Sequence, residues 1–254
     1  MLSDSGGRRV KQTISLFAIG VCAALGLAGT APANAQGTQK TISTAAFFGF
    51  DVGPSAETGY AGAIVALNGD FSRDGFLIRG LGVYSSYDYD ATVGPIDGDM
   101  VLFDGMVGYQ IMRSNIRVAG FVGVEYQDHD LSPNDPDNSV NGDETGFKAV
   151  GEVTLGHGNA LFFNLIGAYS TAYDTHWVRL RPGYNYERFT FGPEIIWQGN
   201  ESYDAHRVGG YLTMRLPDTP FDVTVSSGYH SNEDSGIFGN ENGAYGSINI
   251  GVVF

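Results

Sequence analysis

The last residues of the chain, 243–254, read GAYGSINIGVVF. Side chains alternate between the two faces of a β-strand, so every second residue from Ile248 to Phe254 lies on one apolar face. Ser247 and Asn249 lie on the other face. A final strand with an apolar outer face and a free terminal Phe is typical of the closing strand of a bacterial outer-membrane β-barrel. The ending therefore predicts a barrel in contact with outer-membrane lipid, and it predicts the barrel-assembly machinery as a partner that reads Phe254.

The beginning of the chain predicts a cleavable signal peptide over residues 1–35. A basic region at 8–11 precedes an apolar run at 14–28, and small residues at 33–35 form a cleavage site. The apolar run is shorter than the roughly 20 residues that a membrane-spanning helix needs, so we do not expect an anchor.

Cleavage gives a mature chain from Gln36, which we divide into a short periplasmic arm at 36–43 and a barrel at 44–254. It removes the single cysteine, three of 14 basic residues and one of 28 acidic residues, so the mature net charge is about −16. A cysteine-free chain suits an oxidising compartment and excludes disulfides. We do not expect nucleic acid as a partner, because the chain has no basic surface to neutralise phosphates.

Alternation with a period of two predicts 12 strands after the signal peptide. An even number suits a bacterial barrel with both termini in the periplasm. We therefore predict an all-β, antiparallel, up-and-down transmembrane barrel in the bacterial outer membrane. The predicted strands are 44–53, 58–69, 75–88, 98–112, 115–128, 145–156, 160–171, 175–185, 187–199, 204–216, 219–230 and 243–254.

The connections between these strands alternate in length. Short periplasmic turns and longer outer loops are the asymmetry expected of such barrels. Short connections are predicted at 113–115, 156–159 and 217–220, and longer polar ones at 85–98, 128–145 and 231–242.

Charged residues within the strands share the inward face. A Lys or Arg that faces lipid near the bilayer midplane costs about 2–4 kcal/mol, which fixes this register. Inside the lumen, opposite charges on adjacent strands can form a structural network, or the arginines can line a path for anions or sugars. Pro193 lies within a strand, where it removes a ladder hydrogen bond, so we predict a bulge or local break there. The predicted lumen charge network is Arg117, Glu125, Arg179, Arg181, Glu194 and Arg207, with Asp104, Lys148, Glu152 and Arg215 on the same face.

The segment 126–138, YQDHDLSPNDPDN, is the richest in candidate ligand side chains. Its carboxylates offer the hard oxygen ligands that Ca²⁺ prefers, but the glycine that an EF-hand requires is missing. A solvated loop of Asx and Pro turns is the alternative. We predict no metal and no cofactor. The candidate ligand-binding residues are Tyr126, Asp128, His129, Asp130, Asp135 and Asp137.

His230, Ser231 and Asn232 are the residue types that form the catalytic set of outer-membrane phospholipases, which also have 12 strands. In those enzymes the His and Ser lie two apart on a strand and share a face. Here they are adjacent, so in a strand they point in opposite directions. The sequence contains no G-x-S-x-G or His-Glu-x-x-His motif. We therefore predict no catalytic residues.

Several segments match a known family over most of the mature chain, from about Phe47 to the C-terminus. They are 126–137 followed by Gly142 and Gly146, then 170–174, 192–194 and 207–209. Together they resemble the cellulose biosynthesis protein BcsS family. The resemblance implies an accessory envelope protein beside the bacterial cellulose synthase system, and it supplies no catalytic residues.

The resulting expectation is a non-enzymatic outer-membrane barrel accessory to cellulose biosynthesis or export, with cellulose and components of the synthase complex as partners. A general diffusion pore and an outer-membrane lipid-modifying enzyme are the alternatives. If a glucan contacts the barrel, flat tyrosine rings near the outer loops would stack on its sugars, although such rings also form interfacial girdles. These tyrosines are Tyr84, Tyr87, Tyr89, Tyr126 and Tyr173.

Overall fold

The computed structural model describes residues 42–156, 160–232 and 242–254. The predicted signal peptide lies outside the described residues, together with 36–41 of the predicted arm. Most of the connection predicted at 231–242 and the centre of the one at 156–159 also lie outside them. No helix in the described part of the chain is long and apolar enough to cross a membrane.

Strands make up most of the described chain, and one short 3₁₀ turn, η1 (Ala172–Asp174), accompanies them. Each strand lies within four residues of its predicted limits. The strands are β1 (Thr44–Val52), β2 (Ala56–Ala66), β3 (Gly75–Ala91), β4 (Gly94–Arg113), β5 (Ile116–Ser132), β6 (Gly142–Leu155), β7 (Leu161–Ser170), β8 (His176–Tyr186), β9 (Phe189–Asn200), β10 (Tyr203–Arg215), β11 (Phe221–Asn232) and β12 (Gly243–Val253).

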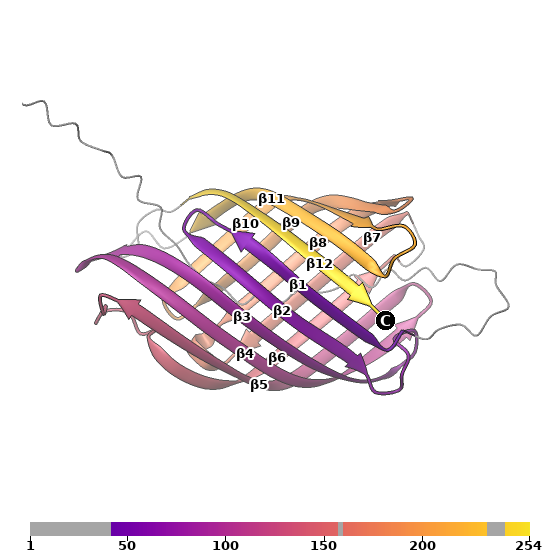
Figure 1. Cartoon of the computed structure of the whole chain (residues 1–254), viewed down its shortest axis with the longest axis horizontal. Helices are drawn as coiled ribbons and strands as arrows, with labels where there is room; N and C mark the ends of the chain where they lie inside the picture. The colour runs from indigo at the N-terminus through magenta and orange to yellow at the C-terminus, as the bar shows by residue number, and fades with distance from the viewer. Residues whose placement is uncertain (1–41, 157–159, 233–241) are drawn as a thin grey trace, which may run out of the picture.

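Each strand pairs antiparallel with its neighbours along the chain, and β1 pairs with β12 to close the barrel (Figure 1). The closing ladder keeps one register, starting with Ala45 opposite Val253. Next to it, the backbone N–H groups of Ser43 and Thr44 both donate to the Phe254 carbonyl oxygen, at 3.0 and 2.8 Å. A closed barrel leaves no unpaired strand edge. The predicted antiparallel up-and-down barrel of 12 strands is confirmed.

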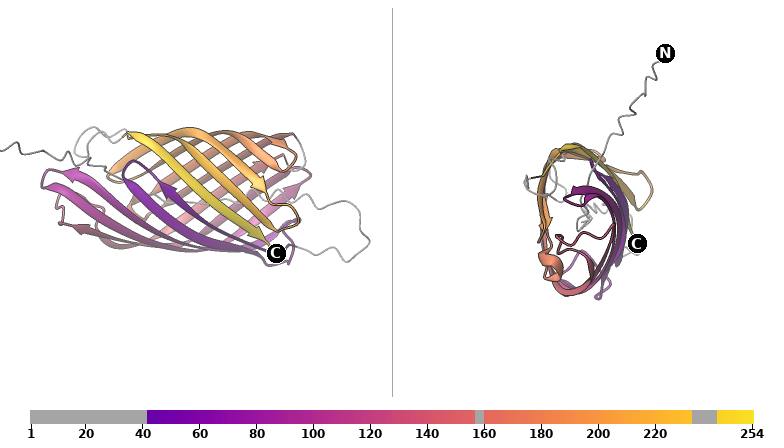
Figure 2. Two further views of the ribbon diagram at one scale, coloured as in Figure 1. Left: turned by 45° about the horizontal axis from the view of Figure 1, so that its top comes forward. Right: turned by 90° about the vertical axis from the view of Figure 1, so that its left-hand side faces the viewer.

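Strand length divides the barrel into two walls. The long wall is β3 to β6, with 14 to 20 residues per strand. The short wall is β7 to β12 with β1 and β2, with 9 to 13 residues per strand. The strands are tilted against the barrel axis, and the cross-section is oval (Figure 2). We call the end where β1 begins and β12 finishes the terminal end, and the opposite end the loop end.

The outward surface is apolar between two bands of aromatic side chains. On the long wall, Phe76 and Tyr109 are exposed towards the terminal end, and Tyr84, Phe103 and Tyr126 towards the loop end. Soluble proteins rarely expose so large an apolar surface, whereas a membrane barrel requires one between aromatic girdles. The strands between the two bands are therefore the membrane-spanning part. Exposed apolar residues of the long wall between the bands include Ile78, Val107, Val118, Val122 and Val124.

The predicted outer loop at 85–98 is wrong. β3 continues to Ala91 and β4 begins at Gly94, so the two strands form a long hairpin with a turn at 92–93. The connection predicted at 128–145 is likewise shorter, because β5 and β6 extend into it and leave only 133–141 between them. At the loop end, the strands of the long wall therefore extend beyond those of the short wall (Figure 1).

The polar and apolar positions change faces at the aromatic band near the loop end, which we call the outer band. This change explains why the sequence predicted loops where β3 and β4 continue. Beyond Tyr84, the aromatic residues Tyr87 and Tyr89 point inward and are buried, while Asp88 and Asp90 point outward. Outward side chains face water at this height instead of hydrocarbon, so the polar positions change sides although the strand continues. The aspartates therefore resemble a loop in the sequence while they belong to a strand in the structure.

The interior is less polar than the sequence predicted. β3 carries apolar side chains on both faces, so its inward Leu77 and Leu81 pack in the lumen while its outward residues face lipid. The result is a packed apolar core along the long wall rather than a polar channel. Its buried members include Leu77, Leu81, Val83, Ile96, Met100, Leu102, Met106 and Phe121.

The break predicted at Pro193 lies in the short wall, between β8 and β9. The ladder pairs Leu180 with Ile195 and resumes with Tyr184 and Phe191 in the same register, so residues are skipped without a bulge. In that register Pro182 faces Pro193, and neither residue has an N–H group to donate. Next to the prolines, a Cβ on Gly192 would lie 2.1 Å from the Pro182 carbonyl oxygen, so the close approach of the strands requires glycine there.

Candidate functional site

A neutral cluster of four buried charges lies within the long wall, with one residue from each strand. Lys148 on β6 forms an ion pair with Glu125 on β5, and its Nζ lies 2.8 Å from Asp104 Oδ2 on β4. Arg79 on β3 approaches the same Asp104 oxygen at 3.5 Å. All four side chains are at most 4% exposed. Two positive and two negative groups balance, as buried charges require.

A second neutral pair lies in the long wall nearer the terminal end. Arg117 Nη1 donates to Glu152 Oε2 at 2.6 Å, and Arg117 Nε donates to Gln110 Oε1 at 3.0 Å. The amide of Gln110 in turn donates to the carbonyl oxygens of Phe71 and Arg73, at 3.0 and 2.8 Å. The pair therefore holds the connection between β2 and β3 against the lumen at this end.

A chain of hydrogen bonds joins the four-charge cluster to the loop end. Tyr87 lies 3.0 Å from His129 Nδ1, His129 Nε2 lies 3.2 Å from Gln127 Oε1, and Gln127 Nε2 donates to Glu125 Oε1 at 2.8 Å. Because the Gln127 oxygen can only accept, His129 donates from Nε2 and accepts from Tyr87 at Nδ1. Burial lowers the pKa of His129 to about 4, so the ring is neutral at pH 7.

In the short wall, polar contacts span strands that are not neighbours. Arg181 on β8 forms an ion pair with Glu194 on β9 and donates from Nη2 to Ser226 Oγ on β11 at 3.0 Å. Tyr245 on β12 donates to Glu194 Oε1 at 3.0 Å. These contacts connect β8 and β9 to β11 and β12 across the curve of the wall.

A second contact of this kind joins β10 to β1. Arg207 Nη1 donates to Asp51 Oδ1 at 2.7 Å, although β11 and β12 lie between their strands. Arg207 Nε donates to His230 Nδ1 at 3.1 Å, and its guanidinium lies 5.2 Å from the centre of the Tyr245 ring. The arginine therefore crosses part of the lumen and ties the two sides of the short wall together.

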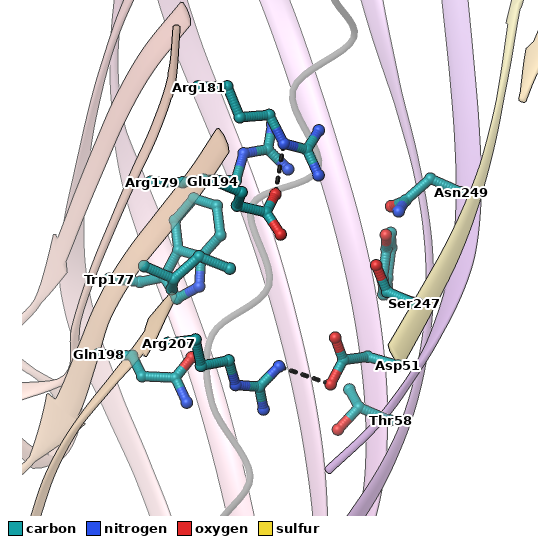
Figure 3. Close-up of a pocket in the computed structure, with 12 residues that line it drawn as sticks. Asp51, Thr58, Trp177, Arg179, Arg181, Glu194, Gln198, Arg207, Ser247 and Asn249 are labelled. Carbon is teal, nitrogen blue, oxygen red and sulfur yellow. Dashed lines mark hydrogen bonds and ion pairs between the residues drawn. The ribbon is translucent and has the colours of Figure 1, made fainter. Parts of the chain in front are cut away.

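These contacts border a partly open cavity of about 30 Å³, which we call the lumen cavity and which has room for a few water molecules (Figure 3). Side chains of β8, β9 and β10 face it from one side, and side chains of β12, β1 and β2 face it from the other. Its lining consists of Asp51, Thr58, Tyr60, Trp177, Arg179, Arg181, Glu194, Ile196, Gln198, Arg207, Ser247 and Asn249.

The predicted lumen charges are all buried, but they form two separate groups. Arg117 and Glu125 lie in the long wall, whereas the four others line the lumen cavity. Sequence reasoning missed Asp51 and Arg79, although each occupies an inward position of its strand. The pairing of Arg207 with Asp51 carries no sequence signal, because it depends on how far the wall curves. The four others are Arg179, Arg181, Glu194 and Arg207.

The candidate ligand residues of segment 126–137 do not converge on one site. Alternation along β5 separates the first four, and the path of the following connection separates the rest. Within the described ranges, no group of three or more His, Cys, Asp or Glu residues is placed to hold a metal ion. Tyr126, Asp128 and Asp130 point outward, His129 and Asp135 are buried, and Asp137 is exposed.

Asp135 instead helps to fold the connection 133–141 over the mouth of the barrel. Tyr89 donates to Asp135 Oδ2 at 3.0 Å, and Asn138 donates to the Tyr89 hydroxyl at 2.9 Å. From the far side of the mouth, the Ser202 hydroxyl donates to Asn138 Oδ1 at 3.1 Å. The connection therefore reaches from the long wall to the turn between β9 and β10.

The five tyrosines proposed for sugar stacking also divide. Tyr84 and Tyr126 lie outward in the aromatic band, and Tyr84 donates to Asp99 Oδ1 at 2.7 Å. Tyr87, Tyr89 and Tyr173 are buried beneath the connection 133–141 or beside it. The five rings therefore do not form one continuous surface on which a sugar chain could stack.

The hydrolytic arrangement considered at His230 is not assembled. His230 and Asn232 are buried on the inward face of β11, and Ser231 between them points the other way. The imidazole accepts a hydrogen bond from Arg207. The His and Ser therefore cannot act together.

Comparison with known proteins gives one family match. The model of the cellulose biosynthesis protein BcsS family matches residues 45–254. No curated protein matches the chain.

Three of the solved structures that are similar to the chain share little sequence identity with it. A KdgM porin is 8% identical with a TM-score of 0.47, and the match covers 83% of this chain and 99% of the porin. The β domain of the Bordetella autotransporter BrkA is 12% identical with a TM-score of 0.46, covering 84% and 99%. CdiB from Acinetobacter baumannii is 8% identical with a TM-score of 0.34, covering 84% and 60%.

The family match spans the whole barrel, including the segments that carry the resemblance noted in the sequence. The chain therefore belongs to the cellulose biosynthesis protein BcsS family.

Proposed function

We propose that this chain is a non-enzymatic barrel of the bacterial outer membrane that assists cellulose biosynthesis or export as an accessory of the synthase complex. Membership of the BcsS family supports the link to cellulose. Side chains that cross the lumen support an accessory role over a role as a channel for the polymer.

The observation that carries the proposal is the contact between Arg207 and Asp51 inside the barrel. Together with the bond between Tyr245 and Glu194, it joins non-neighbouring strands across the lumen cavity, which has a volume of about 30 Å³. A glucan chain is far wider than the few water molecules that such a space admits. In this state the polymer does not pass through the short wall's side of the lumen, so the barrel acts through its surfaces.

The outer surface supports placement in the outer membrane. The apolar zone between the aromatic bands fits a bilayer, and the aspartates beyond the outer band fit the aqueous side of it. We assign the terminal end to the periplasm. There Phe254 has an exposed side chain that the assembly machinery can read, while its backbone is bonded to Thr44.

The test is deletion of the gene in a cellulose-producing strain. We expect less extracellular cellulose, whereas cellulose synthase activity in isolated inner membranes stays unchanged. Complementation with the full wild-type chain restores the polymer.

Two results contradict the proposal. If synthase activity in isolated membranes falls in parallel with the polymer, the protein acts on synthesis and not in the outer membrane. If cellulose is unchanged and the outer-membrane lipid profile differs from wild type, the protein is a lipid-modifying enzyme.

A further inference from the structure

The inward face of β8 to β12 is mostly polar, and its polar residues extend beyond the lumen cavity in both directions. Towards the loop end lie Gln198 and His230, which are both buried. Towards the terminal end, inward threonines of neighbouring strands form hydrogen bonds, such as the one between Thr213 and Thr224 at 2.7 Å. This side of the lumen is therefore lined by groups that hydrate well, in contrast to the apolar core of the long wall.

Large rings on this side lie along the wall and not across the lumen. A Cβ on Gly49 would collide with the hydroxyl of Tyr60, and a Cβ on Gly209 would collide with the hydroxyl of Tyr245. Each ring therefore lies over a glycine of the wall, a position that only a residue without a side chain allows. Twelve strands enclose more space than the about eight whose side chains just fill a barrel. Packed rings therefore do not close this side of the lumen.

The contact that crosses the lumen cavity is the ion pair between Arg207 and Asp51. Arg207 extends from β10 and Asp51 from β1, and their side chains meet in the middle of the space (Figure 3). The base of the arginine is held to the wall, because its Nε donates to His230 on the neighbouring strand. Its end then reaches the opposite side, where Nη1 donates to Asp51. The pair thus acts as a strut between two parts of the wall.

The backbone of the wall does not depend on this strut. β10 pairs with β9 and β11, and β1 pairs with β2 and β12, through continuous ladders. Separating the two side chains therefore removes a contact across the lumen while the closed barrel remains.

We propose that the ion pair between Arg207 and Asp51 is a latch that closes a polar path for small ions along the short wall. With the latch in place, the space between its two sides holds a few water molecules. When the latch is released, the polar groups on either side of it form one hydrated path through the barrel. This latch goes beyond the role in cellulose production and does not depend on it.

The opposite charges of the two latch residues distinguish such a path from a general leak. Asp51→Asn removes the carboxylate and leaves the guanidinium of Arg207 beside the path. Arg207→Gln does the reverse and leaves the carboxylate of Asp51. Fixed charges beside a narrow path favour ions of the opposite sign. The first variant should therefore favour anions more strongly than the second.

The test is recording from the purified mature barrel in planar lipid bilayers under a gradient of potassium chloride. We expect no steady conductance from the wild type and a steady conductance from each latch variant. The reversal potential should shift towards that of chloride in Asp51→Asn and towards that of potassium in Arg207→Gln. The control Arg117→Gln breaks a buried ion pair with Glu152 between neighbouring strands of the long wall, and it should remain silent.

A double variant covers the case in which neither single variant folds. Asp51→Asn combined with Arg207→Gln removes both charges, so no buried charge is left without its partner. Gel mobility before and after heating shows whether the barrel is folded. We expect the folded double variant to conduct, with a reversal potential between those of the two single variants.

The proposal is overturned if the wild type conducts, or if the folded double variant is as silent as the wild type. It is also overturned if Arg117→Gln conducts like the latch variants, or if the two single variants share one reversal potential. Failure of all three latch variants to fold would assign the pair a purely structural role and would overturn it as well.

Discussion

The long wall and the short wall of this barrel are stabilised by different kinds of contact. In the long wall, charged side chains pair mainly between neighbouring strands. The hydrogen-bond ladders that join β3 to β4, β4 to β5 and β5 to β6 run without interruption. In the short wall, two facing prolines interrupt the ladder between β8 and β9, and the contacts of Arg207 and Tyr245 span several strands. The long wall is thus stabilised within itself, whereas the short wall depends on contacts across the lumen.

The interior therefore differs between the two walls. The packed core and neutral clusters of the long wall support the strands that project at the loop end. The short wall keeps a small polar space, the lumen cavity, which three arginines line. Substitutions that affect one wall and spare the other test this difference.

The largest effect is expected from Lys148→Met in the long wall. The substitution leaves Asp104 and Glu125 with Arg79 as the remaining cation of the cluster, and breaking a buried ion pair in this way costs about 3–5 kcal/mol. The measurement is urea unfolding in phospholipid vesicles. The control Arg113→Met removes an exposed pair with Asp74, where water screens the charges, and should cause no comparable loss. Equal losses for the two variants would contradict the role of the cluster.

Next in size is Gly192→Ala in the short wall. The added Cβ would lie 2.1 Å from the Pro182 carbonyl oxygen, so the strands must separate, and overpacking of this kind costs about 1–3 kcal/mol. Gly151→Ala in the long wall adds the same methyl group where no atom lies within 4 Å. Thermal unfolding followed by gel mobility should show a loss for the first variant and none for the second. Equal stability of both would show that the interrupted ladder is not closely packed.

A smaller difference is expected between two tyrosines of the short-wall lumen. Tyr245→Phe removes the hydrogen bond to Glu194, which costs about 1–3 kcal/mol for a charged partner. The buried hydroxyl of Tyr211 has no hydrogen-bond partner among the described residues, so Tyr211→Phe should be neutral or stabilising. Parallel unfolding curves test the pair, and a loss at Tyr211 as large as that at Tyr245 would refute the assignment.

The smallest effect concerns pH and the projecting hairpin of the long wall. Burial, followed by repulsion from Asp97 and Asp90, raises the pKa of Asp88 from 3.8 to about 6. The folded state therefore disfavours the carboxylate, and its cost appears as pH rises from about 4 to above 6. Asp88→Asn should stabilise the barrel above pH 6 by less than about 1 kcal/mol, since the site is largely solvated, and should have no effect below pH 4.

The matched control is Glu57→Gln on the short wall. Glu57 is exposed and faces Ser86 across the ladder, so no acidic residue lies opposite it. A pH-independent gain at Asp88, or the same gain at Glu57, would mean that burial and repulsion of the Asp88 carboxylate are not the cause.

The sequence predicts the strands well because the outward side chains must face hydrocarbon over the membrane, and Phe103 or Val122 has no other stable orientation. That constraint ends at the aromatic band. Beyond Tyr84 the outward residues are aspartates, so a pattern defined by lipid no longer detects the strand. The same argument explains the apolar interior of β3, since Leu77 and Ile78 are consecutive and their faces cannot be distinguished by polarity.

The candidate site was predictable only in part. The inward orientation of Arg181 and Glu194 follows from alternation, and they lie on adjacent strands. The contact of Arg207 with Asp51 depends on the oval cross-section, which brings β10 towards β1 and has no local signal. The acidic segment was misleading for a similar reason, because His129 and Asp135 fold inward to support the mouth while Asp128 and Asp130 remain outside.

The proposed accessory role requires a lumen that side chains close. The most direct test is single-channel recording of the purified mature barrel in planar lipid bilayers. A closed lumen predicts no steady conductance above the bare membrane, whereas a stable open level, present in every insertion and over a range of voltages, would show that the barrel is a diffusion pore.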